Sequence, residues 1–218
     1  MKRAERHHLK EDEMAHGLSW LADFVKKYQR EIMIVAGALA FVAVVLGALA
    51  MVRARGRSVL SRAIGEVGDL AAAAIDDPAK LADLEKLAVK GPAARLANLE
   101  LARYWAGKGD WTKAAEFAGR IGGGRKDLVH YQAEDLKAQI ALGRKDFDAA
   151  IAIYRKAVEE KPEVYPVDAL LFRLAESHEL KGETAAALDI YKKLQEEHAQ
   201  SYYGYEASLK AGRLGLSK

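Results

Sequence analysis

Residues 131–158 read YQAEDLKAQIALGRKDFDAAIAIYRKAV, a pattern that predicts two helices joined by a short polar turn. Two further segments align with this one: ARLANLELARYWAGKGDWTKAAEFAGRI at 94–121 and DALLFRLAESHELKGETAAALDIYKKLQ at 168–195. An acidic residue falls near each turn, at steps of 36 and then 37 residues: Asp110, Asp146 and Glu183. A single helical hairpin cannot bury its apolar face, so the three units are expected to stack on one another.

Small residues recur at matched positions in the three units, where they let helices pack closely. The alanines of the first helices are Ala102, Ala138 and Ala175, and those of the second helices are Ala114, Ala150 and Ala187. This pattern resembles the tetratricopeptide repeat, whose period of about 34 residues is slightly shorter than the period here. The units are degenerate repeats, because the first-helix tryptophan of that family has no counterpart. In the third unit, Thr184 replaces the aromatic residue that Trp111 and Phe147 supply after the turn.

Residues 32–52, IMIVAGALAFVAVVLGALAMV, form an apolar run without a charged or strongly polar side chain. A helix of that length spans about 30 Å, the thickness of the hydrocarbon core of a bilayer. A buried core helix rarely runs so long without a polar face. A cleaved signal peptide is the more specific alternative, since Ala48-Leu49-Ala50 fits the A-x-A pattern of a cleavage site. The apolar run is too long for that, and it follows 31 residues in which acids and bases alternate, so the sequence predicts an uncleaved transmembrane helix.

Basic residues flank both ends of this run, so charge alone leaves the orientation in the membrane open. Those before it are Lys26, Lys27 and Arg30, and those after it are Arg53, Arg55, Arg57 and Arg62. Small residues recur within the run at steps of 4, 3, 4 and 3: Ala36, Ala40, Ala43, Gly47 and Ala50. This spacing predicts a packing stripe on one side of the helix, where another transmembrane helix can approach closely. The alternative is that an alanine-rich run produces the stripe by chance.

The expected fold class is all-α, with a single N-terminal transmembrane helix followed by a tetratricopeptide-like solenoid of helical hairpins. The expected parts are a polar tail with a short interfacial amphipathic helix at 1–31, the transmembrane helix at 32–52, a helical connector at 53–90, and the repeat domain with a C-terminal capping helix at 91–218. Within the connector, one helix is expected to continue from the membrane to residue 75, and a second is expected at 79–89.

The composition excludes several kinds of chemistry. The chain has no cysteine, so disulfides, thiolate metal sites and cysteine nucleophiles are absent. Its 34 basic and 31 acidic residues are mixed along the chain, which argues against nucleic-acid binding. His7, His8 and His16 lack the spacing of a metal site, and His178 is expected to pack inside its repeat. No nucleophile elbow or phosphate loop is present. We therefore expect no enzyme activity, no catalytic residue, no metal, no cofactor and no small-molecule substrate.

A candidate protein-binding groove follows from the repeat pattern. In stacked helical hairpins, the first helix of each unit lines the concave face. By repeat position, that face carries Leu99, Arg103, Asp135, Gln139, Phe172 and Glu176. An extended or helical peptide is expected to lie there. The alternative is that these are ordinary solvated side chains, with Leu99 and Phe172 in the core.

The whole arrangement resembles the ancillary subunit family of the SecYEG translocon of Gram-negative bacteria. The residues that carry the resemblance are KEDE at 10–13, the aromatic helix before the span, and the repeat spacing. The resemblance implies a single-pass inner-membrane protein with a cytoplasmic N-terminus and a periplasmic repeat domain. It also implies translocon subunits, periplasmic chaperones or client polypeptides as partners, with membrane lipid around residues 32–52. The arginines after the span depart from the implied orientation.

Two other hypotheses for the function remain open. The first makes the same predictions from the sequence, and the second differs only in the role of the N-terminal tail. One is an assembly adaptor for another envelope complex, which only the identity of the partner distinguishes. The other is a regulator that acts through its cytoplasmic tail while the repeats sense the envelope. Deleting residues 1–17 abolishes regulation in that case and leaves a scaffold working.

Overall fold

The structure is a computed structural model that describes residues 26–122 and 124–216. The described residues form α-helices and no strand, which confirms the predicted all-α class. The predicted polar tail and most of the predicted interfacial helix lie outside the described residues.

The described part of the chain contains a long first helix and eight shorter ones. They are α2 (Gln29–Ala73), α3 (Lys80–Val89), α4 (Ala94–Gly107), α5 (Trp111–Gly119), α6 (Leu128–Gly143), α7 (Phe147–Glu159), α8 (Val167–Lys181), α9 (Thr184–Glu197) and α10 (Tyr202–Leu216). The chain divides into two compact units, Met1–Ser58 and Val59–Lys218, and α2 contributes residues to both. The hairpins α4–α5, α6–α7 and α8–α9 of the second unit coincide with the three repeated segments of the sequence.

The turns of the three hairpins share one backbone feature. The residue before the turn acid has a positive φ in every case: 77° at Gly109, 61° at Lys145 and 87° at Gly182. This left-handed conformation ends the first helix and turns the chain back along it. Glycine adopts the conformation without steric cost, whereas a residue with a Cβ loses about 1–2 kcal/mol. The turn at Lys145 is therefore the strained one of the three.

The repeated turn acid starts the second helix in two of the hairpins. The carboxylates of Asp110 and Asp146 each accept a hydrogen bond from the backbone N–H three residues later, at 3.0 and 3.1 Å. Such caps satisfy backbone donors that the first turn of a helix leaves without partners. Glu183, one methylene longer, does not cap α9, and its Oε2 instead lies 2.6 Å from Nδ1 of His178. The predicted packing role of His178 agrees with its buried position in α8.

The alanines that the sequence places at helix contacts are all buried. Ala102, Ala114, Ala138, Ala150, Ala175 and Ala187 are each 0 % exposed. Their small side chains let the two helices of each hairpin approach closely, and a larger side chain there has no room in an interior packed at crystal-like density. The hairpin architecture predicted from these positions is thereby confirmed.

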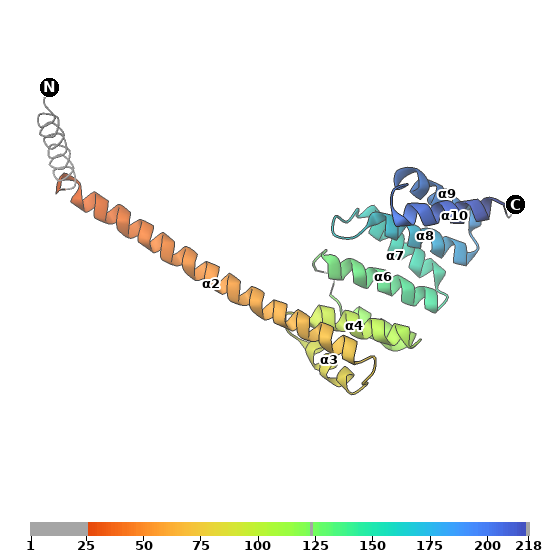
Figure 1. The fold of residues 1–218 in the computed structure, drawn as a ribbon, viewed down its shortest axis with the longest axis horizontal. Helices are drawn as coiled ribbons and strands as arrows, with labels where there is room; N and C mark the ends of the chain where they lie inside the picture. The colour runs from red at the N-terminus through yellow and green to blue at the C-terminus, as the bar shows by residue number, and fades with distance from the viewer. Residues whose placement is uncertain (1–25, 123, 217–218) are drawn as a thin grey trace, which may run out of the picture. The chain divides into compact units, whose positions relative to one another are not determined.

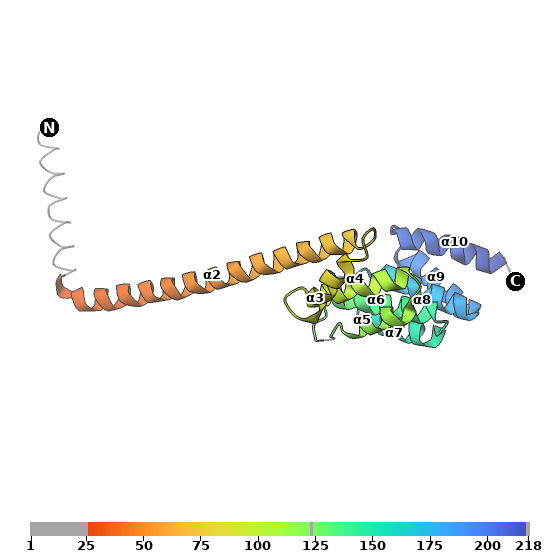
Figure 2. The same ribbon diagram turned by 90° about the horizontal axis from the view of Figure 1, so that it is seen from below.

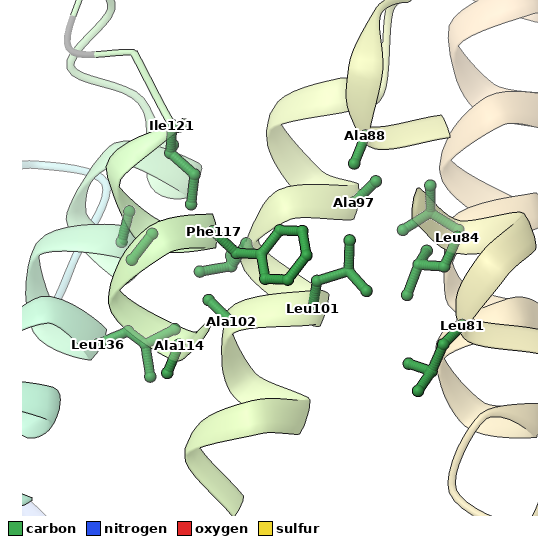
Figure 3. Packing of buried hydrophobic residues seen from close by; sticks show 14 of the residues in the cluster. Leu81, Leu84, Ala88, Ala97, Leu101, Ala102, Ala114, Phe117, Ile121 and Leu136 are labelled. Carbon is green, nitrogen blue, oxygen red and sulfur yellow. The ribbon is translucent and has the colours of Figure 1, made fainter. Parts of the chain in front are cut away.

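The end of α2 belongs to the core of the second unit. Val67 is 0 % exposed and packs in one cluster with Leu84 of α3 and Leu101 of α4. Figure 3 shows Leu84 and Leu101 facing one another, with Phe117 of α5 beyond Leu101. The C-terminal part of α2 thus packs into the same apolar cluster as α3 and α4, within the segment expected to be a connector.

Polar contacts fix the first repeat to its neighbours. Nδ2 of Asn98 donates to the backbone oxygens of Ala88 (2.8 Å) and Ala94 (2.9 Å), which ties α4 to the end of α3. Arg95 donates two hydrogen bonds to Asp127, at 2.6 and 3.0 Å, and so links the starts of α4 and α6. The hydrogen bond from Arg95 is the largest of the influences that hold the pKa of Asp127 below its ordinary value. Asp127 therefore stays a carboxylate well into the acidic range.

The hairpins of the second unit follow one another in chain order, as Figure 1 shows. Seen from below in Figure 2, α5 and α7 lie at one side of the stack and α10 lies at the other. Three apolar clusters fill the interior in succession: the first runs from the end of α2 to α6, the second from α6 to α8 with α9 touching it, and the third from α8 to α10. The first helices α4, α6 and α8 are thus held in a fixed order, and their remaining exposed surface is the candidate site.

Candidate protein-binding surface

The structure divides the six predicted groove residues into two groups. Leu99 is 0 % exposed and Phe172 is 7 % exposed, so both pack in the core and their side chains are not available to a ligand. Phe172 is buried because its ring packs against Tyr191 of α9 and against Tyr203 of α10, the helix that follows the repeats. The ring centroids lie 5.6 and 5.4 Å apart, respectively. The polar members Arg103, Asp135, Gln139 and Glu176 keep exposed or half-buried side chains.

Two of the polar members meet at one pocket. Arg103 of α4 and Gln139 of α6 lie on the lining of a hollow of about 460 Å³ between the first and second hairpins. The rest of its lining is small or apolar: Ala106, Gly107, Trp111, Leu136, Leu142 and Gly143. The pocket therefore offers a mostly apolar surface whose lining also carries an amide and the guanidinium of Arg103, which is paired with Glu100 at 2.7 Å.

Trp111 and Gly143 set the shape of this pocket. A Cβ added at Gly143 would lie 2.6 Å from the indole ring of Trp111, so the ring packs directly on the glycine backbone. Arg144 donates to the backbone oxygen of Trp111 at 2.8 Å, which ties the start of α5 to the end of α6. The sequence marked Trp111 as the aromatic after the first turn but not as a pocket residue, because its partner lies in the next repeat.

Asp135 is occupied by contacts within the protein. Its carboxylate accepts hydrogen bonds from the hydroxyls of Tyr154 (2.8 Å) and Tyr165 (3.1 Å), and from Nε2 of Gln139 (3.0 Å). Burial, followed by the negative charge of Asp135, raises the pKa of Tyr154 and of Tyr165, so both phenols stay protonated donors at neutral pH. Asp135 therefore anchors the second hairpin, and it positions Gln139 on the lining of the pocket.

Several charged side chains of α8 are paired. Arg173 donates to Glu176 at 2.8 Å, and this pairing raises the pKa of Arg173 although burial acts in the opposite direction. Lys210 of α10 and the hydroxyl of Tyr191 both donate to Glu179, at 2.9 Å each. Charges of both signs thus neutralise each other along this part of the surface, which suits a polypeptide of mixed composition better than a phosphate backbone.

The histidines of the N-terminal tail lie outside the described residues. Among the residues that the structure does describe, no group of three or more His, Asp or Glu side chains is arranged to hold a metal ion.

The apolar run lies in α2, and its small residues lie on an exposed helix. Ala36, Ala40, Ala43, Gly47 and Ala50 are all exposed. Within the described ranges, α2 is the helix long and apolar enough to cross a membrane, and none of its most apolar window is buried. That exposure distinguishes it from a buried core helix, whereas a signal sequence near the N-terminus has the same length and composition.

Comparison with known proteins supports a tetratricopeptide-like repeat in the C-terminal part of the chain. The tetratricopeptide repeat family model matches residues 141–211, from the end of α6 into α10. No curated protein and no solved structure matched the chain. Tetratricopeptide repeats generally mediate protein–protein interactions. The fold and this match together indicate a tetratricopeptide-like helical repeat preceded by one apolar helix.

Proposed function

We propose that this protein is a membrane-tethered scaffold that binds polypeptides on the surface of α4, α6 and α8. The apolar run 32–52 would hold the repeats at a bilayer, where their effective concentration toward membrane partners is high and weak contacts suffice. The observation that carries the proposal is the pocket between the first two hairpins. Its apolar lining suits a buried side chain of the bound polypeptide, and Arg103 and Gln139 on the same lining suit the polar groups beside that side chain.

The finer proposal is an accessory subunit of the SecYEG translocon that links the channel to periplasmic chaperones or to emerging clients. It rests on the resemblance of the charged tail, the aromatic segment, the span and the repeat spacing. In this arrangement the N-terminus is cytoplasmic and the repeat domain is periplasmic in a bacterial inner membrane. The protein acts by holding its partners and carries out no reaction.

Site-specific photocrosslinking tests the binding surface and the partner together. A photoreactive amino acid replaces Gln139 at the pocket or, as a control, Arg155, which is exposed on α7. We expect crosslinks from position 139 to translocon subunits, chaperones or clients, identified by mass spectrometry, and none of these from position 155. Equal crosslinking from both positions would contradict the pocket as the binding surface. Crosslinks from position 139 to another envelope complex would replace the translocon with an assembly adaptor.

A single introduced cysteine tests the orientation. Because the chain has no cysteine of its own, Lys192→Cys on the exposed surface of α9 supplies one reactive thiol. We expect a membrane-impermeant maleimide to label it in intact spheroplasts. Labelling that appears only after lysis would place the repeats in the cytoplasm and contradict the translocon proposal, while leaving the scaffold class intact.

A further inference from the structure

The part of α2 that directly follows the apolar run carries three arginines, Arg53, Arg55 and Arg57. All three are exposed, and none forms an ion pair with another described residue. No acidic residue occurs from residue 32 to residue 65. The arginines therefore form an uncompensated positive segment at the end of the apolar run.

The helical positions of these arginines point to a partner that surrounds the helix. At roughly 100° per residue, Arg53 and Arg57 lie about 40° apart on one side of α2, and Arg55 lies about 160° from Arg53 on the other side. A protein partner contacts one side of a helix, whereas lipid headgroups surround it on every side. Charge on opposite sides of the helix thus matches the geometry of a lipid layer.

The depth of the arginines fits the same partner. Arg53 and Arg57 are separated by a rise of about 6 Å along the helix axis. The headgroup layer on each side of the hydrocarbon core is about 5–8 Å thick. With residues 32–52 in the hydrocarbon, all three guanidinium groups lie at the level of the lipid phosphates, which a guanidinium binds through paired hydrogen bonds.

We propose that Arg53, Arg55 and Arg57 form a binding ring for the headgroup phosphates of anionic phospholipids. The inference rests on the proposed membrane tether and adds a lipid preference to it. Each basic side chain near an anionic membrane surface raises the association constant for that surface about fivefold. The preference for anionic over zwitterionic lipid is therefore expected to be several-fold and to decrease as ionic strength rises.

Electron paramagnetic resonance with spin-labelled lipids tests the ring in the full-length chain. The protein is reconstituted in phosphatidylcholine vesicles that contain trace spin-labelled phosphatidylglycerol or phosphatidylcholine, and the relative association constant of the two probes is measured. We expect the unaltered chain to prefer phosphatidylglycerol several-fold. The triple variant R53Q/R55Q/R57Q is expected to lose this preference, whereas R53K/R55K/R57K keeps most of it because the charge remains.

A matched control removes three exposed cations from the repeats: R155Q/K156Q/K192Q. It is expected to keep the full preference, which separates the local ring from net charge. Equal association of both probes with the unaltered chain, or an undiminished preference in R53Q/R55Q/R57Q, would overturn the lipid site. Absence of any immobilised lipid around the unaltered chain is a different result, because it would overturn the membrane tether and the ring with it.

Discussion

Replacing Val67 by alanine asks whether the end of α2 contributes to the stability of the repeats. Val67 is fully buried between α2, α3 and α4, and the substitution removes two methyl groups. The lost transfer free energy is about 1.6 kcal/mol at ~0.8 kcal/mol per buried carbon. The residual cavity adds about 1 kcal/mol. The higher helix propensity of alanine returns about 0.5 kcal/mol, which leaves an expected net loss of about 2 kcal/mol.

The matched control is Val59→Ala, the same substitution on the same helix at a side chain that is 50 % exposed. Val59→Ala brings the same gain in helix propensity, and it is expected to change the free energy of unfolding by no more than about 0.5 kcal/mol. The assay is urea unfolding of the full chain in detergent micelles, followed by tryptophan fluorescence. Relative to the control, the midpoint of Val67→Ala is expected to fall by about 1 M. Equal midpoints for the two variants would refute the packing of α2 against the repeats.

Four other substitutions are predicted from local geometry, and urea unfolding measures the stability of each variant. Gly204→Ala is expected to destabilise the protein by about 1–3 kcal/mol, because a Cβ there overlaps a backbone carbonyl at the end of α9, whereas Gly212→Ala on the same helix meets nothing and gains up to about 1 kcal/mol. Lys145→Gly relieves the left-handed turn and is expected to stabilise by about 0.5–1 kcal/mol; a lower midpoint would contradict strain at that turn. The folded-state pKa of Asp127 lies below its unfolded value of about 3.9, so its contribution is present above that pH and is lost as the pH falls through the lower folded value. Asp127→Asn is therefore expected to lower stability at neutral pH and to flatten its decline in acid, and an unchanged acid profile would show that the ion pair contributes nothing.

The features of this fold that depend on local pattern were predictable from the sequence. The three hairpins follow from apolar periodicity and from the repeated alanines, which are buried in every repeat. The helix at Lys80–Val89 lies where the sequence places one. The acids at the turns were recognised as a repeat, but their capping role differs between Asp110 and Glu183 because one extra methylene changes which groups the carboxylate reaches.

The candidate site was less predictable, because exposure depends on neighbours that are distant in sequence. Repeat alignment places Leu99 and Phe172 at the same position, and both are buried: Leu99 in the first apolar cluster, and Phe172 against Tyr203 of α10. The pocket depends on contact between Trp111 and Gly143, which belong to different repeats. The burial of Val67 likewise depends on the cluster that it forms with Leu84 of α3 and Leu101 of α4, and nothing in the local sequence around Val67 marks it as core.

The succession of three apolar clusters has a consequence for how the protein responds to force and to thermal opening. Each hairpin draws its contacts from the hairpins next to it in the chain, so cooperativity is local and openings propagate stepwise, as in a one-dimensional array. Backbone amides of α10, which packs on α9 and α8 at the end of the array, should exchange with solvent before those of α4, which is packed between α3, α5 and α6. A partner that pulls on the C-terminal end would therefore peel off one hairpin at a time, beginning with α10 and the hairpin α8–α9.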